Sequence, residues 1–333
     1  MKNACIVGYG AIGPVHAKAI SSNENICLYA VCETNPDRAK KCTDAYSDVV
    51  VYNDFYQMLK DDNIDVVHIC TPHYLHFEMA KASLEAGKDI VLEKPVTIER
   101  EDFKKLEDIC KNSNKKICIM LQNRTNPCIV KMKEVVDSGN YKLTGIVANM
   151  AWKRDEEYYN QDEWRGSWKY EGGGLIINQA VHLVDMMVYF GGKVKEVYSN
   201  LARWNVTNIE VEDSANALIK FDSGVNGIFS ASNCHSANAP FYLELQFEGM
   251  CLRYADNVLY QIKGEDIQII CRDSQAFEGK KYWGNGHTRV IDAYYNSLEG
   301  GDSTYSNLDD SKQAMEVVYT MYEQCNKLKG QES

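Results

Sequence analysis

The sequence lacks any apolar run near the ~18 residues that a membrane-spanning helix requires, so we expect no such segment. None of its 12 cysteines forms a C-x-x-C pair, and several lie within apolar segments, so we expect reduced thiols that pack as small apolar side chains. The chain also starts without the architecture of a signal peptide, and we therefore expect a cytoplasmic protein in which disulfides are rare.

Positive charge is scarce compared with negative charge. The 36 Lys and Arg residues against 47 Asp and Glu residues give a net charge of −11 over 333 residues. A chain this acidic is not expected to bind nucleic acid or an anionic membrane surface. Internal repeats, low-complexity blocks and flexible linkers are also missing, whereas 45% apolar and 25% charged residues are ordinary for globular proteins. At ~150 residues per domain, the length predicts about two domains.

Short apolar segments alternate with helical patterns through the first third of the chain. The segments at 4–7, 27–32, 66–70 and 90–92 are rich in Val, Ile and Leu. Runs of this kind are typical of parallel strands that are buried on both faces of a sheet. The alternation therefore predicts a doubly wound α/β domain of the Rossmann type over residues 1–122.

After residue 122 the segments become longer and alternate between polar and apolar residues, with turn signals such as Asp222-Ser223-Gly224. This pattern predicts an α+β domain over residues 123–333 with a large, mostly antiparallel sheet. We expect helices at 175–190, 287–299 and 309–328, the last of them able to pack back on the first domain. One face of the sheet needs a cover, so we expect a homodimer or a homotetramer.

A G-x-G-x-x-G motif follows the first apolar segment and precedes a helical pattern, which is the context that gives the motif meaning. Gly8 would allow a tight turn, Gly10 the close approach of a pyrophosphate, and Gly13 the close packing of helix on strand. The free N–H groups of the helix N-terminus would bind the phosphates. A glycine-rich turn without a ligand is the alternative. The motif consists of Gly8, Tyr9, Gly10, Ala11, Ile12 and Gly13.

An acidic residue, Glu33, ends the second predicted strand. Its carboxylate would bind the ribose hydroxyls of adenosine and would repel a 2′-phosphate. Residues 34–37 that follow include no arginine. We therefore expect NAD(H) rather than NADP(H) as the cofactor. The alternative is that Glu33 is only a surface charge at the end of a strand.

Two further segments follow strands at the carboxyl edge of the parallel sheet, where ligands bind in such folds. In the segment Glu93-Lys94-Pro95, a desolvated Lys94 would donate to a substrate oxygen, and the alternative is an exposed loop lysine. In the segment Cys70-Thr71-Pro72-His73-Tyr74-Leu75-His76, the two histidines have no third ligand nearby, so we expect no metal site. We expect His73 and His76 to cap a helix or to pack on the nicotinamide.

Polar residues also follow the triple glycine at 172–174. Asn178, His182 and Asp185 share one face if a helix begins at this glycine run. One interpretation is a site in which His182 acts as a general acid and base. The other interpretation is a buried polar cluster, and spacing alone leaves both open. Three tyrosines lie nearby in the sequence: Tyr158, Tyr159 and Tyr170. One interpretation is that they line a sugar pocket, and the other is that they are ordinary surface residues.

These motifs, in this order, resemble the glucose–fructose oxidoreductase/inositol dehydrogenase/MocA (Gfo/Idh/MocA) family. The resemblance covers essentially the whole chain, and it implies a Rossmann domain followed by an open-faced sheet domain. It implies Lys94 and His182 as the catalytic pair, supported by Asn178 and Asp185. Residues expected to bind the cofactor also include Cys70, Thr71, Pro72, His73, His76, Glu93, Lys94 and Gln122. Residues expected to bind substrate are Asn123, Trp164, Arg165, Asn178 and His182.

The resemblance implies an NAD-dependent dehydrogenase that acts on a secondary alcohol of a sugar, a cyclitol or a sugar derivative. One departure concerns Asn178, since many relatives have Asp there and an amide cannot take a proton. A redox-neutral alternative is glycoside cleavage through a transient keto-sugar. A non-catalytic NAD or sugar sensor is the second alternative.

Overall fold

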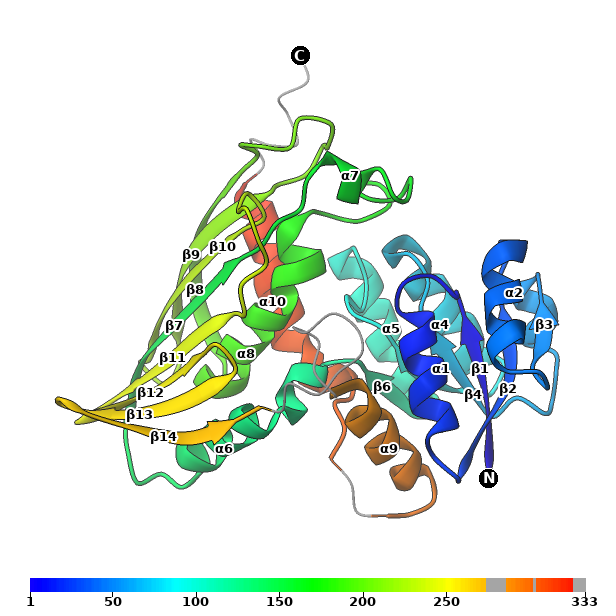
Figure 1. Cartoon of the computed structure of the whole chain (residues 1–333), viewed down its shortest axis with the longest axis horizontal. Coiled ribbons are helices and arrows are strands. Elements are labelled where there is room, and N and C mark those ends of the chain that lie inside the picture. Colours follow the sequence, from blue (N-terminus) through cyan, green and yellow to red (C-terminus); the bar gives the residue numbers. More distant parts are fainter. Residues whose placement is uncertain (274–285, 302–303, 326–333) are drawn as a thin grey trace. The chain divides into compact units, whose positions relative to one another are not determined.

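The computed structural model of the protein describes residues 1–273, 286–301 and 304–325. The chain forms two compact units (Figure 1). Unit 1 comprises Met1–Gln122 and Asn285–Ser311, and unit 2 comprises Asn123–Gly284 and Lys312–Ser333. The last three residues of the helix expected at 309–328 lie outside the described residues.

Unit 1 contains a six-stranded sheet and the helices that flank it. Its strands are β1 (Lys2–Val7), β2 (Ile26–Cys32), β3 (Val50–Tyr52), β4 (Val66–Ile69), β5 (Asp89–Leu92) and β6 (Ile117–Ile119). Its helices are α1 (Gly13–Ser21), α2 (Pro36–Ala45), α3 (Phe55–Met58), the 3₁₀ turn η1 (His73–Leu75), α4 (His76–Glu85), α5 (Arg100–Asn112) and α9 (Gly286–Leu298).

All neighbouring strands of this sheet run parallel, in the order β3-β2-β1-β4-β5-β6. In this order the chain changes its winding direction between β1 and β4. Open α/β sheets bind ligands at such a point, outside the carboxyl ends of the two strands. The predicted doubly wound parallel sheet is thus confirmed. The strands form because their near-continuous apolar residues are buried on both faces, as in β4, where all four residues are buried.

Helix α9 brings residues from late in the chain into unit 1. Val290, Ile291, Tyr294 and Tyr295 of this helix are at most 3% exposed, and they join the core that Ile6 of β1 also enters. Helix α9 also packs along α1. The helix that follows the glycine motif therefore packs against a segment that begins only at residue 286.

Unit 2 contains an eight-stranded sheet in the order β14-β13-β12-β11-β7-β10-β9-β8. Only the pair β7 and β10 is parallel, so the predicted mostly antiparallel sheet is confirmed. The strands are β7 (Leu143–Ala151), β8 (Val194–Ala202), β9 (Ser214–Phe221), β10 (Asn226–Ser232), β11 (Tyr242–Phe247), β12 (Met250–Ala255), β13 (Val258–Lys263) and β14 (Asp266–Arg272). Strand β14 was not predicted.

The helical elements of unit 2 are the 3₁₀ turn η2 (Gln122–Thr125), α6 (Pro127–Asp137), α7 (Glu156–Tyr159), the π-helical turn η3 (Ile176–Ala180), α8 (Val181–Gly191) and α10 (Leu308–Gln324). Elements η2 and α10 begin in unit 1 and continue into unit 2. Figure 1 shows α8 and α10 on one face of the large sheet. In β9, alternate residues are buried and exposed, as expected for a strand that is covered on one face. No helix among the described residues is long and apolar enough to cross a membrane.

The helix that we expected at 175–190 is not a single α-helix. Ile176–Ala180 form a π-helical turn, and α8 begins directly after it. A π turn accommodates one extra residue and changes the direction of the side chains that precede it, and such turns are frequent at functional sites. Asn178 lies within this turn and His182 within α8, so the even helical spacing that we assumed does not hold between them.

Candidate active site

The glycine motif forms the turn between β1 and α1, and two of its glycines are required by the chain itself. Gly8 has a φ of +88°, and a Cβ there would lie 2.8 Å from the carbonyl oxygen of Cys70. A Cβ on Gly13 would lie 2.6 Å from the carbonyl oxygen of Gly8. The nearest atom to a Cβ on Gly10 would be Nη1 of Arg38, at 3.8 Å. This is ordinary contact with the end of a flexible side chain, so the turn at Gly10 leaves room for the approach of a dinucleotide pyrophosphate.

Glu33 follows β2 and faces this turn. Its Oε2 accepts a hydrogen bond of 2.6 Å from the Tyr9 N–H, and its Oε1 accepts one of 2.9 Å from the Asn35 N–H. The carboxylate is 8% exposed. It therefore joins the glycine turn to the beginning of α2, at the position where the sequence predicted a ribose-binding acid.

Arg38 is a residue that our sequence reasoning missed. We considered only residues 34–37 after Glu33, and Arg38 is the next residue in the chain. The Asn35 side chain caps α2 by accepting from the Asp37 and Arg38 N–H groups. The helix thus begins early enough for the Arg38 guanidinium to reach Gly10. The N-cap and the Pro36 that follows it were a signal for this placement.

His76 joins the ends of two strands. Its Nδ1 lies 2.6 Å from the Pro95 carbonyl oxygen, and its Nε2 lies 2.9 Å from the Thr71 carbonyl oxygen. Thr71 in turn packs against Gly8, because its methyl carbon would lie 3.2 Å from a Cβ there. These contacts bring together the segments after β1, β4 and β5. Burial lowers the pKa of His76, and a neutral imidazole donates to only one of the two carbonyl groups.

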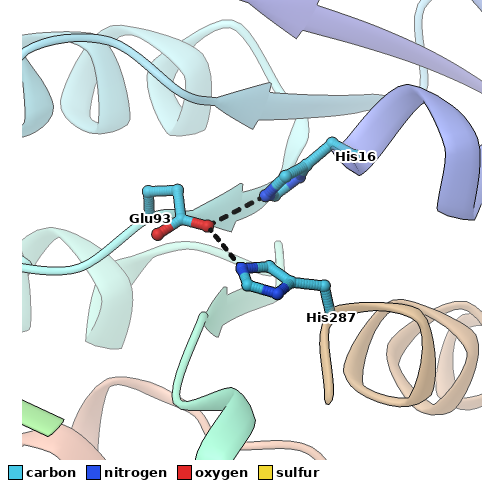
Figure 2. A group of neighbouring side chains, drawn as sticks. All are labelled: His16, Glu93 and His287. Atoms are coloured by element: carbon cyan, nitrogen blue, oxygen red, sulfur yellow. Dashed lines mark hydrogen bonds and ion pairs between the residues drawn. The ribbon is translucent and has the colours of Figure 1, made fainter. Parts of the chain in front are cut away.

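Glu93 follows β5 and lies between histidines from two helices (Figure 2). Its Oε1 lies 3.0 Å from Nε2 of His16 in α1 and 3.3 Å from Nε2 of His287 in α9. Its Oε2 accepts from the Lys94 N–H at 3.2 Å. Burial acts to raise the pKa of Glu93, but the hydrogen bonds from His16 and His287 hold it well below its usual range. The carboxylate is therefore ionised.

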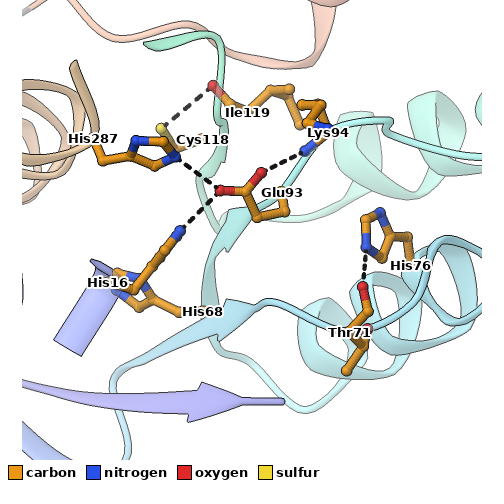
Figure 3. A network of polar contacts seen from close by, with 9 residues as sticks. All are labelled: His16, His68, Thr71, His76, Glu93, Lys94, Cys118, Ile119 and His287. Atoms are coloured by element: carbon orange, nitrogen blue, oxygen red, sulfur yellow. Dashed lines mark hydrogen bonds and ion pairs between the residues drawn. The ribbon is translucent and has the colours of Figure 1, made fainter. Parts of the chain in front are cut away.

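His16 continues this network away from Glu93 (Figure 3). Its Nδ1 lies 2.9 Å from Nδ1 of His68 on β4, and Nε2 of His68 lies 2.9 Å from the Tyr295 hydroxyl of α9. Burial lowers the pKa of both His16 and His68, that of His68 strongly. Both imidazoles are therefore neutral near pH 7.

Two groups of side chains have the composition of metal ligands. His16, Glu93 and His287 in unit 1 offer three ligand atoms within 4.8 Å of one another. Cys128, Cys271 and Asp273 in unit 2 do the same. In the second group, the Asp273 carboxylate accepts from the Cys128 N–H and from the Tyr254 hydroxyl. His73 and His76, the pair that the sequence drew attention to, have ring centroids 5.8 Å apart.

The triple glycine of unit 2 allows a close approach to another strand. A Cβ on Gly174 would lie 2.1 Å from the Glu212 carbonyl oxygen. The Glu212 carboxylate accepts from the Gly174 and Ile176 N–H groups and from the Tyr322 hydroxyl. This buried acid therefore fixes the start of the segment that carries Asn178 and His182. Burial raises the pKa of Glu212 to about 7.

Asn178 contacts a second buried acid, Glu171. The Asn178 Nδ2 donates to Glu171 Oε1 at 2.5 Å, and the Gly166 N–H donates to Oε2 at 2.5 Å. Glu171 is 0% exposed, and this burial raises its pKa to about 7. The sequence analysis missed Glu171, although its position directly before three glycines was a signal that it enters a tight turn.

Aromatic and cationic side chains surround Tyr158. The guanidinium of Arg165 lies 4.5 Å from the Tyr158 ring centre, and that of Arg154 lies 4.8 Å from it. Arg165 also donates to the Tyr158 hydroxyl at 2.5 Å and lies over the Trp164 ring. Gln179 donates to the same hydroxyl at 3.0 Å. The structure thus brings together Trp164, Arg165 and the Asn178 segment around Tyr158.

The remaining expected site residues belong to different elements of the two units. Asp185 forms a two-bond ion pair with Arg124, of 3.0 and 2.6 Å, and it is 1% exposed. Gln122 and Asn123 lie at the start of η2 and are buried. Lys94 belongs to unit 1 and His182 to unit 2.

Two family models match the sequence. Residues 2–121 match the model described as "Oxidoreductase family, NAD-binding Rossmann fold", and residues 129–253 match the "GFO/IDH/MocA C-terminal domain". The chain is 28% identical over 227 residues to the 1-carboxy-3-chloro-3,4-dihydroxycyclo hexa-1,5-diene dehydrogenase of Comamonas testosteroni, which covers 66% of this chain and 55% of that protein. It is 22% identical over 326 residues to the myo-inositol 2-dehydrogenase of Thermotoga maritima, which covers 94% of this chain and 93% of that protein.

A solved structure with the same fold is the WlbA dehydrogenase from Bordetella pertussis in complex with NADH and UDP-GlcNAcA. Its TM-score is 0.86 and its sequence identity is 25%, over 98% of this chain and 97% of that chain. The likeness therefore extends through both units.

The raised pKa of Glu171 predicts a pH-dependent stability difference between wild type and Glu171→Gln. Because the folded-state pKa is about 7 and the ordinary value is 4.5, the acid contributes stability below the ordinary value. That stability is lost as the pH rises through about 7. Between about pH 5 and pH 8, the variant should gain roughly 3 kcal/mol relative to wild type, measured by urea unfolding.

The matched control is Glu157→Gln, which changes an exposed glutamate of α7. Its stability relative to wild type should stay constant over the same pH range. A constant difference for Glu171→Gln as well would contradict the raised pKa.

Proposed function

The chain belongs to the Gfo/Idh/MocA oxidoreductase family, and on that basis we propose that it transfers hydride between NAD(H) and a secondary alcohol of a sugar, cyclitol or sugar derivative. The observation that carries the proposal is the set of contacts at the carboxyl edge of the parallel sheet. Gly8 packs on Cys70 and Thr71, and His76 joins Thr71 to Pro95. The dinucleotide turn and the residue next to Lys94 are therefore parts of one rigid assembly within unit 1.

The residues of unit 1 fit the dinucleotide. Gly10, whose added Cβ would meet no atom closer than the Arg38 guanidinium, and the N-terminus of α1 suit a pyrophosphate. Glu33 suits the ribose hydroxyls. Cys70, Thr71, Pro72 and His73 belong to the same strand edge and would line the remainder of the cofactor. The bound nicotinamide supplies the hydride acceptor, and the protein supplies orientation and electrostatics.

We assign the proton chemistry to Lys94 and His182. Lys94 donates to the reacting oxygen of the substrate and stabilises the negative charge that develops on it. His182 takes the hydroxyl proton as general base. Asn178 and Asp185 support this step, and Trp164, Arg165 and Asn123 bind the rest of the substrate, with a sugar ring against the indole. Gln122 completes the cofactor contacts.

The assay that tests this function follows the near-ultraviolet absorbance of NADH. Purified protein receives NAD⁺ or NADP⁺ with a panel of inositols, aldoses, glycosides and nucleotide sugars. We expect reduction of NAD⁺ by one substrate class, since Glu33 disfavours a 2′-phosphate. Protein that binds NADH yet reduces no NAD⁺ with any member of the panel would instead favour the redox-neutral or sensor alternatives.

The roles of Lys94 and His182 predict that Lys94→Ala and His182→Ala each lower kcat by about 10²–10⁴-fold, the usual loss for an acid–base group. Neither change should alter the Kd for NADH, measured by NADH fluorescence, by more than a few-fold. Lys104→Ala, which removes an exposed lysine of α5 paired with Glu101, is the control and should retain full activity. Wild-type activity in either active-site variant would exclude that residue from catalysis.

The different surroundings of two glycines predict different effects of adding one methyl group. Gly13→Ala should lower the melting temperature, because its Cβ would clash with the backbone of Gly8. Gly10→Ala should leave the melting temperature unchanged and raise the Kd for NADH by on the order of 10–100-fold, because the methyl group fills the space of the pyrophosphate. Unchanged NADH binding by Gly10→Ala would contradict a dinucleotide at this turn.

We also propose that the open face of the large sheet is covered by a second copy of the chain, as a homodimer or within a homotetramer. Three exposed apolar residues face one another in register there, Tyr198 on β8, Leu218 on β9 and Ile228 on β10. They are 64%, 59% and 53% exposed. An exposed apolar row of this kind is typical of an interaction surface.

Leu218→Asp should therefore convert the protein to a monomer in size-exclusion chromatography with light scattering, because a carboxylate cannot be buried unpaired in an apolar interface. Leu218→Ile, which keeps the apolar surface, should leave the oligomer intact. A monomeric wild type would contradict the proposal, as would an oligomer that is indifferent to Leu218→Asp.

A further inference from the structure

A continuous chain of buried polar side chains crosses unit 1 behind the cofactor motif. It begins at the Tyr295 hydroxyl, continues through His68 and His16, and ends at the Glu93 carboxylate. Figure 3 draws the part formed by His68, His16 and Glu93. The three links measure 2.9, 2.9 and 3.0 Å. None of the three imidazole and phenol rings is more than 3% exposed. Four elements, α9, β4, α1 and the end of β5, therefore share one network.

The chemistry of the groups assigns a direction to every hydrogen bond in this chain. Ionised Glu93 only accepts, so His16 Nε2 carries the proton. A neutral His16 then has a lone pair on Nδ1, and His68 Nδ1 must donate to it. His68 Nε2 is left with a lone pair and accepts from the Tyr295 hydroxyl. All donors thus point toward Glu93, and bonds aligned in this way strengthen one another.

Glu93 receives two more donors, which makes it the end point of the network. His287 Nε2 lies 3.3 Å from the same Oε1, and the Lys94 N–H donates to Oε2. A Cβ on Gly286 would lie 2.4 Å from the Gln122 carbonyl oxygen, so α9 begins at a glycine that permits this approach. Among the described residues, Cys70, Cys118 and His76 also interact with the Glu93 charge.

We propose that Tyr295, His68, His16 and His287 are positioning residues that act through Glu93 to fix the backbone of Lys94. The inference rests on the proposed function, in which the Lys94 amino group contacts the reacting oxygen. His16 and His287 hold the carboxylate through Oε1, and the Lys94 N–H that donates to Oε2 is thereby held as well. The lysine side chain therefore starts from one backbone conformation, and misplacement of a catalytic group by ~1 Å costs on the order of 10²-fold in rate.

The first test determines by NMR which ring nitrogen of each histidine carries a proton, and it needs no substrate. The seven histidines are labelled with ¹⁵N, and His16→Asn, His68→Asn and His287→Asn assign three of them by NMR. We expect His16 to be neutral with the proton on Nε2 and His68 to be neutral with the proton on Nδ1. His287 should carry a proton on Nε2, because it donates to the Glu93 carboxylate. A proton on Nδ1 of His16 would overturn the proposal.

The same measurement separates the network from a metal site. A metal ion among His16, Glu93 and His287 needs the lone pair of His16 Nε2, so the proton would move to Nδ1. Stoichiometric zinc in purified protein, measured by plasma mass spectrometry, would therefore also overturn the proposal.

The second test compares two neighbouring tyrosines of α9. Tyr295→Phe removes the donor at the far end of the network, whereas Tyr294→Phe removes a hydroxyl that donates to the Lys116 carbonyl oxygen at 2.9 Å. Both residues are buried. We expect Tyr295→Phe to lower kcat on the order of tenfold, with KM and the Kd for NADH unchanged, and Tyr294→Phe to change none of the three.

The outcomes separate the positioning role from a structural role and from the function itself. Equal kcat values for the two variants, or parallel losses of kcat and melting temperature, would overturn the positioning role. A wild-type protein that reduces no NAD⁺ would contradict the proposed function. In that case the role for Lys94 fails with it, while the imidazole protons still establish whether the network is arranged as described.

Discussion

The buried, ionised carboxylate of Glu93 is the constraint on which the organisation of unit 1 depends. A charge that is 6% exposed costs several kcal/mol unless donors surround it. The donors come from α1, from α9 and from the backbone of Lys94. The helix behind the glycine motif and a helix from the end of the chain are therefore both tied to the strand end where we place catalysis.

Unit 2 also contains buried carboxyl groups that need hydrogen-bond donors, but there the donors are of other kinds. Glu212 accepts from two backbone N–H groups and a tyrosine hydroxyl, and Glu171 accepts from one backbone N–H and an amide. At Glu93 the donors are two imidazole N–H groups and one backbone N–H, and the hydrogen bonds from the imidazoles outweigh burial. The pKa of Glu171 and that of Glu212 accordingly rise to about 7, whereas that of Glu93 falls. Two acids of unit 2 are therefore close to the point where a small change in surroundings changes their charge.

Local sequence signals predicted the parallel sheet and the residues at its strand ends. The strands of unit 1 are continuous apolar runs, and Glu33, Glu93 and Lys94 directly follow such runs. Strand β14 was missed because six of its seven residues are exposed, so it lacks the alternation of a half-buried strand.

The buried network was not predictable in the same way. His16 and His287 are single histidines within helical patterns, and nothing in their local sequence indicates a shared partner. His16 meets a residue 77 positions away, so only the tertiary fold identifies the pair. Asn178 illustrates the same limit, because the resemblance shows that many relatives have Asp there but does not explain the departure. An aspartate would place a second carboxylate where Nδ2 now donates to Glu171 at 2.5 Å. Two buried carboxylates at that distance cannot both be ionised. The amide therefore donates to Glu171 without adding a second buried carboxylate, and this neighbour lies seven residues away in the chain.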